Sequence, residues 1–308
     1  MTATPDRLET EPLHPAFGVT IANVDLSAML ADREAGAATF ARLRDAFERH
    51  SVLLLPDQTL TPEEHLAFAR LWGPIEDREA DTRAKGEAFA IPQVSNRRAE
   101  GGVVAPDALH SLNLQANQLW HTDSTFLPTP ALANILIART VPSEGGETEL
   151  ASTRAAWAAM PEDLKTELRD TVFWHRYAHS RAQISPELAR LPMFSRWADR
   201  PWRAVWTNPV TGEEALYIAS HAFRVEGLSD AEAATLIGDL IAFATAPAYV
   251  YTHRWRPGDV MVFDERATLH RGRPWPLQEE RTLSSLCVSA GPDDGLASIR
   301  PPARVADA

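Results

Sequence analysis

Residues 119–126 read Leu-Trp-His-Thr-Asp-Ser-Thr-Phe, and the interpretation of the whole chain starts from this short stretch. It places His121 two residues before Asp123, inside a run of apolar, β-branched and aromatic side chains. Such a run is typical of a buried strand, in which residues i and i+2 point to the same face. The pattern therefore predicts that His121 and Asp123 project together into one cavity, close enough to bind one ion.

A third ligand for that ion is available far downstream. Residues 261–264 (Met-Val-Phe-Asp) read as a buried strand, and His270 follows it, just before the basic turn of residues 271–274. Two imidazoles and one carboxylate form the facial triad of non-haem ferrous oxygenases, which leaves three coordination positions open. The alternatives are a surface or structural His-x-Asp pair and, for His270, a core histidine that donates to a carbonyl. Of the ten histidines, however, His121 is the only one with an acid two residues later.

Composition and charge exclude several classes of partner. The hydrophobic fraction of 44% and the charged fraction of 23% are ordinary for a soluble globular protein. A net charge of −12 disfavours polyanions, so we expect neither nucleic-acid nor membrane binding. Cys287 is the only cysteine, which excludes an intramolecular disulfide and fits a reducing cytoplasm. No apolar run approaches the ~20 residues that span a bilayer. We therefore expect a cytoplasmic protein with a small-molecule substrate, as a monomer or a homo-oligomer.

The fold class follows from many short strands separated by Gly and Pro turns. Periodicity and capping signals predict helices at 34–49, 61–72, 153–159, 161–171 and 229–244. Apolar or alternating runs predict strands at 17–27, 51–56, 89–95, 133–138, 215–219, 249–255, 259–264 and 281–288, and one from Thr148. This pattern indicates a mainly β fold, a sandwich or jelly roll with helical additions. With no repeat and no linker, residues 1–308 read as one domain.

Two stretches interrupt the pattern of strands and helices. Residues 76–117 lack a sustained period, and residues 174–203 are irregular and rich in arginine and aromatic residues. Long irregular segments in a compact domain are usually functional or disordered, so both are predicted to be lids over the site. The tail at 300–308 is expected to be irregular.

The sequence around these ligands resembles the TauD/TfdA family, the taurine and 2,4-dichlorophenoxyacetate dioxygenases, over nearly the whole chain. The resemblance implies a double-stranded β-helix (jelly roll) core with N-terminal helices and lid loops. It also implies Fe(II), 2-oxoglutarate and O2 as cofactors and co-substrates, with His121, Asp123 and His270 as catalytic metal ligands. The implied reaction couples oxidative decarboxylation of 2-oxoglutarate to C–H hydroxylation of a small aryloxyalkanoate, sulfonate or sulfate. Hydroxylation next to an ether or ester oxygen would then cleave that bond.

Three further positions match the family by spacing. Thr148 lies 27 residues after His121 and Arg281 lies 11 residues after His270, where the family binds the distal carboxylate of 2-oxoglutarate. Asn117, four residues before His121, matches a position beside the substrate. A buried carboxylate needs a cation with good geometry, which the planar guanidinium of an arginine supplies. The alternatives are an ordinary ion pair of Arg281 with Glu279 or Glu280, and a purely structural Thr148.

The sequence departs from the family at two positions. The family commonly has a second arginine fifteen residues after the distal histidine, where it meets the anionic group of the substrate, but this chain has Ser285 there. An anionic substrate would then need a cation from one of the two lids or nearby, for which the candidates are Arg97, Arg98, Arg181 and Arg224. The second departure is Glu265, which follows Asp264 where relatives often have asparagine, and the sequence offers no physical account of it.

Two other functions remain open at this point. Ser285 and the long lids also suit a tailoring oxygenase that acts on a neutral or cationic metabolite. A cupin-like metal-binding protein without turnover is the alternative from another class. It would have no use for a pair such as Thr148 and Arg281, and succinate formation would distinguish it from the enzyme.

Overall fold

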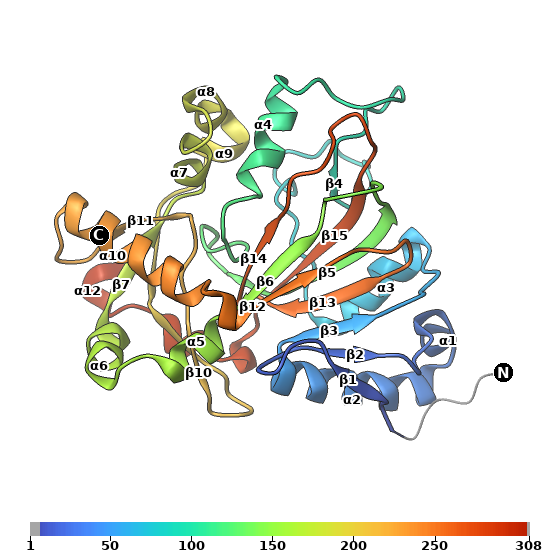
Figure 1. The fold of residues 1–308 in the computed structure, drawn as a ribbon, viewed down its shortest axis with the longest axis horizontal. Coiled ribbons are helices and arrows are strands. Elements are labelled where there is room, and N and C mark those ends of the chain that lie inside the picture. Colours follow the sequence, from blue (N-terminus) through green and yellow to red (C-terminus); the bar gives the residue numbers. More distant parts are fainter. Residues whose placement is uncertain (1–6, 307–308) are drawn as a thin grey trace.

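The computed structural model describes residues 7–306, and its largest element is a seven-stranded sheet (Figure 1). Neighbouring strands run antiparallel except β2 and β3, which are parallel. In sheet order the strands are β1 (Thr10–Pro12), β2 (Val19–Ile21), β3 (Val52–Leu55), β13 (Val260–Asp264), β5 (Ala131–Thr140), β15 (Thr282–Ser289) and β4 (Gln93–Ser95). The chain therefore has a mixed sheet-and-helix fold built on one large sheet.

A smaller sheet packs against one face of the large one. Its strands are, in order, β12 (Val250–His253), β6 (Thr148–Ser152) and β14 (Thr268–Gly272). Leu150 of the small sheet shares a buried apolar cluster with Leu136 and Met261 of the large one. His270 is paired with Leu150 across the two strands, and Thr148 lies two residues before Leu150, so both face the same side. The space between the sheets thus receives His270 and Thr148.

Helices cover the opposite face of the large sheet. These are α1 (Leu26–Ala31), α2 (Arg33–His50) and α3 (Pro62–Trp72), which bury residues such as Phe47 and Phe68 with Ile135 of β5 in one cluster. Helix α3 begins where the sequence predicts, and Thr61 and Glu64 form a capping box there. The predicted helices at 34–49 and 61–72 are therefore confirmed.

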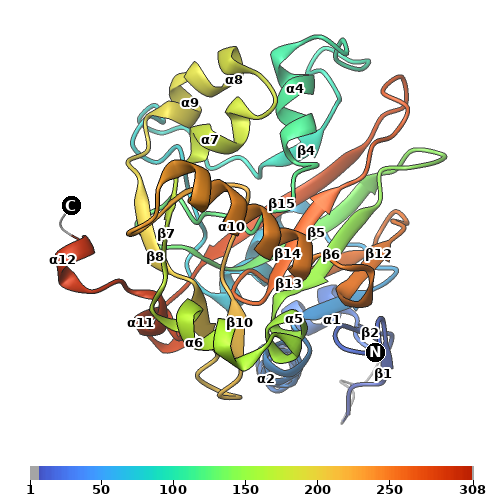
Figure 2. The ribbon, with the colours of Figure 1, turned by 60° about the vertical axis from the view of Figure 1, so that its left-hand side comes forward.

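Other helices and strands cover the outer face of the small sheet. Helix α10 crosses in front of this sheet in Figure 2, and its Leu240 packs with Ala151 of β6 and Leu269 of β14. The elements of this layer that share the buried cluster are α5 (Thr153–Ala159), α6 (Glu162–Asp170), α10 (Asp230–Ala244), η1 (Pro247–Tyr249), β7 (Val172–His175), β9 (Val205–Thr207), β10 (Glu214–Leu216) and β11 (Ala222–Val225). Strand β8 (Arg200–Arg203) completes a three-stranded sheet with β7 and β11, and β9 pairs with β10. Near the end of the chain lie η2 (Pro292–Asp294), α11 (Leu296–Ile299) and α12 (Ala303–Ala306). Within residues 7–306 no helix has the length and apolar character needed to cross a membrane.

Four short helices gather at one end of the two sheets in both views (Figures 1 and 2). They are α4 (Leu109–Ala116), α7 (Tyr177–Ala182), α8 (Pro186–Arg190) and α9 (Pro192–Ser195). The expectation that 174–203 is irregular was wrong, because three of these helices lie in it. Pro186 and Pro192 each start one of them at the first position, where a proline loses no hydrogen bond.

Two other expectations also need correction. Residues 26–31 form a helix rather than continuing strand β2, because Asp25 caps it by accepting from the Ala28 amide. The tail is helical over 303–306, where Val305 packs against Val172 and Trp174. The last two residues of the predicted tail, 307–308, lie outside the described part of the chain.

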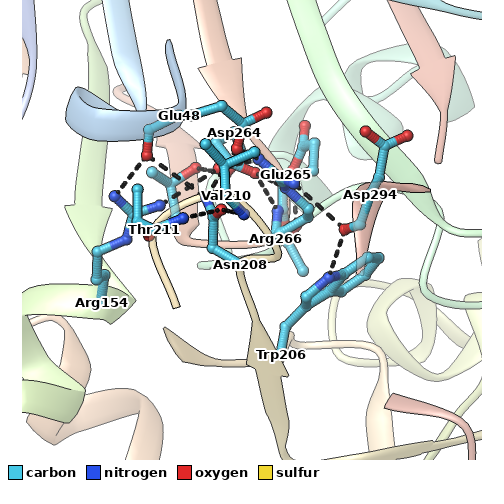
Figure 3. Close-up of polar contacts among 12 residues, drawn as sticks. Glu48, Arg154, Trp206, Asn208, Val210, Thr211, Asp264, Glu265, Arg266 and Asp294 are labelled. Atoms are coloured by element: carbon cyan, nitrogen blue, oxygen red, sulfur yellow. Dashed lines mark hydrogen bonds and ion pairs between the residues drawn. The ribbon is translucent and has the colours of Figure 1, made fainter. Parts of the chain in front are cut away.

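A buried ion network fixes the turn between β13 and β14, which leads to His270 (Figure 3). Arg266 donates to both carboxylate oxygens of Asp264, at 2.8 and 3.0 Å, and to Glu48 of helix α2 at 2.7 Å. The side chains of Arg266 and Glu48 are each 2% exposed and that of Asp264 is fully buried. Asn208 donates a further hydrogen bond to Glu48. The network ties the helical layer outside the large sheet to the end of the strand before His270.

Replacing Arg266 with methionine should lower the free energy of unfolding by about 3–5 kcal/mol, because it removes the buried cation that bridges Asp264 and Glu48. Arg44 then remains beside Glu48, and Arg154 remains 3.7 Å from Asp264. Urea unfolding of the two proteins measures this difference. Arg49→Met is the matched control, since Arg49 pairs with Asp45 while both side chains are more than half exposed, and it should cost no more than about 1 kcal/mol. Equal losses in the two variants would show that the buried network does not stabilise the turn.

Candidate active site

Three potential metal ligands come together between the sheets. The ligand atoms of His121, Asp123 and His270 all lie within 4.8 Å of one another, and Nε2 of His121 is 3.9 Å from Oδ1 of Asp123. The main chains of the two histidines are joined by a pair of hydrogen bonds, His121 N–H to His270 O (3.0 Å) and His270 N–H to His121 O (2.7 Å). These bonds hold the two imidazole rings with their centroids 4.2 Å apart. The structure thus brings together the three residues that the sequence predicted.

The route by which Asp123 reaches this position differs from the prediction. Residues 119–126 are not a strand, because only His121 forms a bridge and the chain then turns, with Ser124 at φ 64°. Asp123 is instead held by side chains of the large sheet. Asn134 (2.8 Å) and the Cys287 thiol (3.3 Å) both donate to its Oδ2. Ser285 donates in turn to the Asn134 side-chain oxygen at 3.0 Å. One carboxylate oxygen is therefore fixed by the sheet, and the other faces His121.

The protonation states of the three side chains suit a metal ion. The Nδ1–H of His121 donates to the Leu119 carbonyl at 2.7 Å, which leaves Nε2 as the free nitrogen facing Asp123. Burial lowers the pKa of His270 to about 3 and also lowers that of His121, so both rings are neutral. Burial opposes ionisation of Asp123, but the facing His270, His121 and Arg78 hold its pKa below the ordinary value. Neutral imidazoles and an ionised carboxylate are the forms that bind a divalent metal, so the donor set fits Fe(II).

Glu265 supports this cluster and gives a physical reason for the departure noted in the sequence. It is fully buried behind the ligands, and its Oε2 accepts hydrogen bonds from the Thr122 hydroxyl (2.6 Å) and the Asp123 amide (2.9 Å). The same oxygen lies 3.8 Å from Nδ1 of His270. Burial and the nearby Asp123 raise the pKa of Glu265 well above its usual value. The sequence marked Glu265 only as a departure from the family and gave no indication of its contacts with Thr122 and Asp123.

The ligands line a cavity of about 350 Å³ that also contains the other predicted site residues. Thr148 and Arg281 line it, and Asn117 and Ser285 line it as well. Apolar and aromatic side chains supply much of its remaining wall, among them Phe89, Phe126, Leu136, Tyr177, Trp197, Trp275, Leu283 and Leu286. A cavity with mostly apolar walls and a few polar groups is typical of a small-molecule site.

Arg281 is a buried cation without an acid partner among the described residues. The two acids that precede it in the sequence are engaged elsewhere, Glu279 with Ser143 and Glu280 with Arg97. Burial lowers the pKa of Arg281 to about 10, and its Nε–H donates to the Gly146 carbonyl at 2.9 Å. Gly146 has φ +70°, and a Cβ there would lie 3.0 Å from the Arg281 side chain, so a glycine is needed for this approach. The guanidinium is thus positioned for an anion that the protein itself does not supply.

Thr148 offers a hydroxyl to the same cavity. Its Oγ1 accepts a hydrogen bond from Nε1 of Trp255 at 2.9 Å, which leaves the hydroxyl proton free to donate. Thr148 is buried at the start of β6 and lines the cavity.

Comparisons with known proteins find relatives over most of the chain. A family model described as "Taurine catabolism dioxygenase TauD, TfdA family" matches residues 9–287. The alpha-ketoglutarate-dependent 2,4-dichlorophenoxyacetate dioxygenase of Cupriavidus pinatubonensis is 34% identical over 276 residues, covering 88% of this chain and 94% of the relative. The (S)-phenoxypropionate/alpha-ketoglutarate-dioxygenase of Sphingobium herbicidovorans is 32% identical, covering 91% and 94%. The crystal structure of AAD-2 with Mn(II) and N-oxalylglycine superimposes with a TM-score of 0.82 at 30% identity, covering 94% of this chain and 98% of that one.

Proposed function

Because this chain belongs to the taurine catabolism dioxygenase TauD, TfdA family, we propose a reaction and a role for each residue of its site. The protein is an Fe(II)- and 2-oxoglutarate-dependent dioxygenase. It couples oxidative decarboxylation of 2-oxoglutarate to hydroxylation of a C–H bond in a small organic substrate. Relatives named for 2,4-dichlorophenoxyacetate, (S)-phenoxypropionate and sulfate esters support an aryloxyalkanoate or a sulfate ester as that substrate.

His121, Asp123 and His270 would hold the iron, and the observation that carries this proposal is their convergence within 4.8 Å. When bound, Fe(II) supplies the open positions at which 2-oxoglutarate and dioxygen react. The main-chain bridge between the histidines and the Asn134 hydrogen bond to Asp123 orient the ligands before the metal arrives. The two facing sheets around them support a jelly-roll core.

Arg281 and Thr148 would bind the far carboxylate of 2-oxoglutarate. A buried carboxylate is stable only beside a cation and with its lone pairs satisfied. The guanidinium of Arg281 provides two N–H donors in one plane, and the Thr148 hydroxyl provides a third donor. The largely apolar cavity wall limits access of water to the reacting end. Asn117 and Ser285, which line the same cavity, lie in the part left for the substrate.

Anaerobic titration of the metal-free protein with Fe(II) and then 2-oxoglutarate tests the proposal. Chelation of an oxo-acid by ferrous iron gives a weak visible charge-transfer band, which we expect to saturate at one equivalent of iron. Succinate release in air with each candidate substrate then identifies turnover. Iron binding without the band would instead support the metal-binding protein without turnover. A band with turnover of neutral compounds alone would support the tailoring oxygenase.

A further inference from the structure

Two buried arginines of the cavity lack an acid partner. The half-buried Arg78 pairs with Glu76, and the guanidinium of Arg83 pairs with Asp77. Arg181 and Arg281, by contrast, are 5% and 3% exposed and form no ion pair within the described part of the chain. The proposed function places one carboxylate, that of 2-oxoglutarate, beside Arg281. The charge of Arg181 still needs a partner.

The surroundings of Arg181 hold its guanidinium in one place but do not neutralise it. Nη1 donates to the Ser180 hydroxyl at 3.1 Å, and Nη2 donates to the Tyr177 hydroxyl at 3.2 Å and to the Asn117 amide oxygen at 3.5 Å. Three bonds leave two of the five guanidinium N–H groups, Nε–H included, without an acceptor among residues 7–306. The guanidinium also stacks over the rings of Tyr177 (4.6 Å) and Phe194 (5.2 Å). A rigidly held, unpaired buried guanidinium is a built anion site.

We propose that Arg181 binds the carboxylate of an aryloxyalkanoate substrate. It would thus replace the arginine that the family commonly has at the position of Ser285. This inference rests on the proposed function and names its substrate class. Ser285 cannot serve, because its hydroxyl donates to Asn134 and supports Asp123 instead. The cation for the substrate therefore lies on helix α7, at the end of the sheets, and not on the large sheet.

The position of Arg181 suits the chemistry of such a substrate. Arg181 lines the same cavity as His121 and His270. Its Nη2 donates to the side chain of Asn117, whose main-chain carbonyl accepts from the Gly272 amide, two residues after His270. In a 2-aryloxyalkanoate, such as 2,4-dichlorophenoxyacetate, the carbon that carries the ether oxygen is directly bonded to the carboxylate. A carboxylate held by Arg181 therefore keeps that carbon near the ligands. The aryl group then meets aromatic side chains, since Tyr177 stacks on Phe126 with ring centroids 3.8 Å apart.

The other three arginines suggested by the sequence do not line the cavity. Arg97 is mostly exposed and lies 3.6 Å from Glu280, and Arg98 pairs with Glu100. Arg224 pairs with Glu226 and stacks on Trp174. Arg181 is therefore the one of the four candidates with both the burial and the unpaired charge that a substrate anion requires.

Equilibrium binding to the anaerobic Fe(II) and 2-oxoglutarate complex tests the proposal, with the shift of the charge-transfer band as the readout. The probes are 2,4-dichlorophenoxyacetate, the neutral 2-(2,4-dichlorophenoxy)ethanol of the same skeleton, and hexyl sulfate. We expect the unaltered enzyme to prefer the carboxylate to the alcohol. Arg181→Met should raise the Kd of the carboxylate by at least about tenfold and change that of the alcohol little, because only the charge contact is lost. The carboxylate Kd of Arg181→Lys should lie between those of the unaltered enzyme and Arg181→Met, since a lysine keeps the charge without the planar fork.

Arg224→Met is the matched control, because it removes the same charge outside the cavity, and its Kd values should equal those of the unaltered enzyme. A carboxylate Kd unchanged in Arg181→Met overturns the proposal. So does an unaltered enzyme that binds the alcohol as tightly as the carboxylate, an outcome that needs no variant to fold. Loss of hexyl sulfate binding alone in Arg181→Met overturns the assignment to a carboxylate. Failure of the proposed function is recognised separately, by the absence of the band in the unaltered protein.

Discussion

Asp123→Ala is expected to abolish tight Fe(II) binding while leaving the metal-free fold intact. Substitutions that only disturb the orientation of a metal ligand typically cost about 10–100-fold in affinity, so loss of the single anionic ligand should cost more than about 100-fold. The metal-free protein should unfold at nearly the same temperature, because the substitution removes a buried charge together with its desolvation cost. His121→Ala should show the same loss of metal.

Equilibrium dialysis against Fe(II) under anaerobic conditions measures this effect. Asp199→Ala is the control, because Asp199 pairs with Arg176 at the surface and lies outside the cavity. It should retain one iron per chain. Stoichiometric iron in Asp123→Ala would show that the ligand set has been assigned wrongly, since the remaining imidazoles do not form a facial site.

Arg281→Ala should raise the KM for 2-oxoglutarate strongly. Truncating one partner of a buried, hydrogen-bonded charge pair costs about 2–5 kcal/mol, which corresponds to roughly 30-fold or more. The KM of Arg281→Lys should lie between those of the unaltered enzyme and Arg281→Ala. An ammonium keeps the charge but cannot form two parallel hydrogen bonds to the carboxylate. Succinate release at varied 2-oxoglutarate concentration gives the KM of each variant.

Arg97→Ala is the matched control for this experiment. Arg97 lies beside Glu280, one residue before Arg281, but its side chain is 60% exposed and it does not line the cavity. Its KM should stay within about twofold of the unaltered value, as expected for an exposed pair. If Arg281→Ala matches this control, another cation binds the 2-oxoglutarate carboxylate.

The ligand cluster could be predicted from the sequence although the local structure around it could not. The expected strand at 119–126 is mostly a turn, yet the side chains of His121 and Asp123 still converge. Side chains two residues apart can approach each other in a turn as well as in a strand. Long helices with strong caps, such as α3 and α10, were predicted because local side-chain hydrogen bonds determine where they start. The helices α7 to α9 are too short to show a period, and their packing against one another stabilises them.

The contacts that support the metal ligands could not be predicted from the sequence, for a different reason. Glu265 meets Thr122, and Ser285 meets Asn134, from segments far apart in the chain. Neither pair has a spacing that a pattern could reveal, because the contacts exist only once the strands are in register. The same holds for Arg181, which sequence analysis could name only as one of four candidates.

The hydrogen bonds between the main chains of His121 and His270 also bear on how the enzyme is made. They join two segments separated by almost half of the chain, so the iron site has no local precursor. During synthesis the ribosome releases His121 long before strand β14 exists, and contacts of such long range form late in folding. Nascent chains that end before β14 should therefore have no tight affinity for iron, which protects them from oxidative damage by a half-built redox centre.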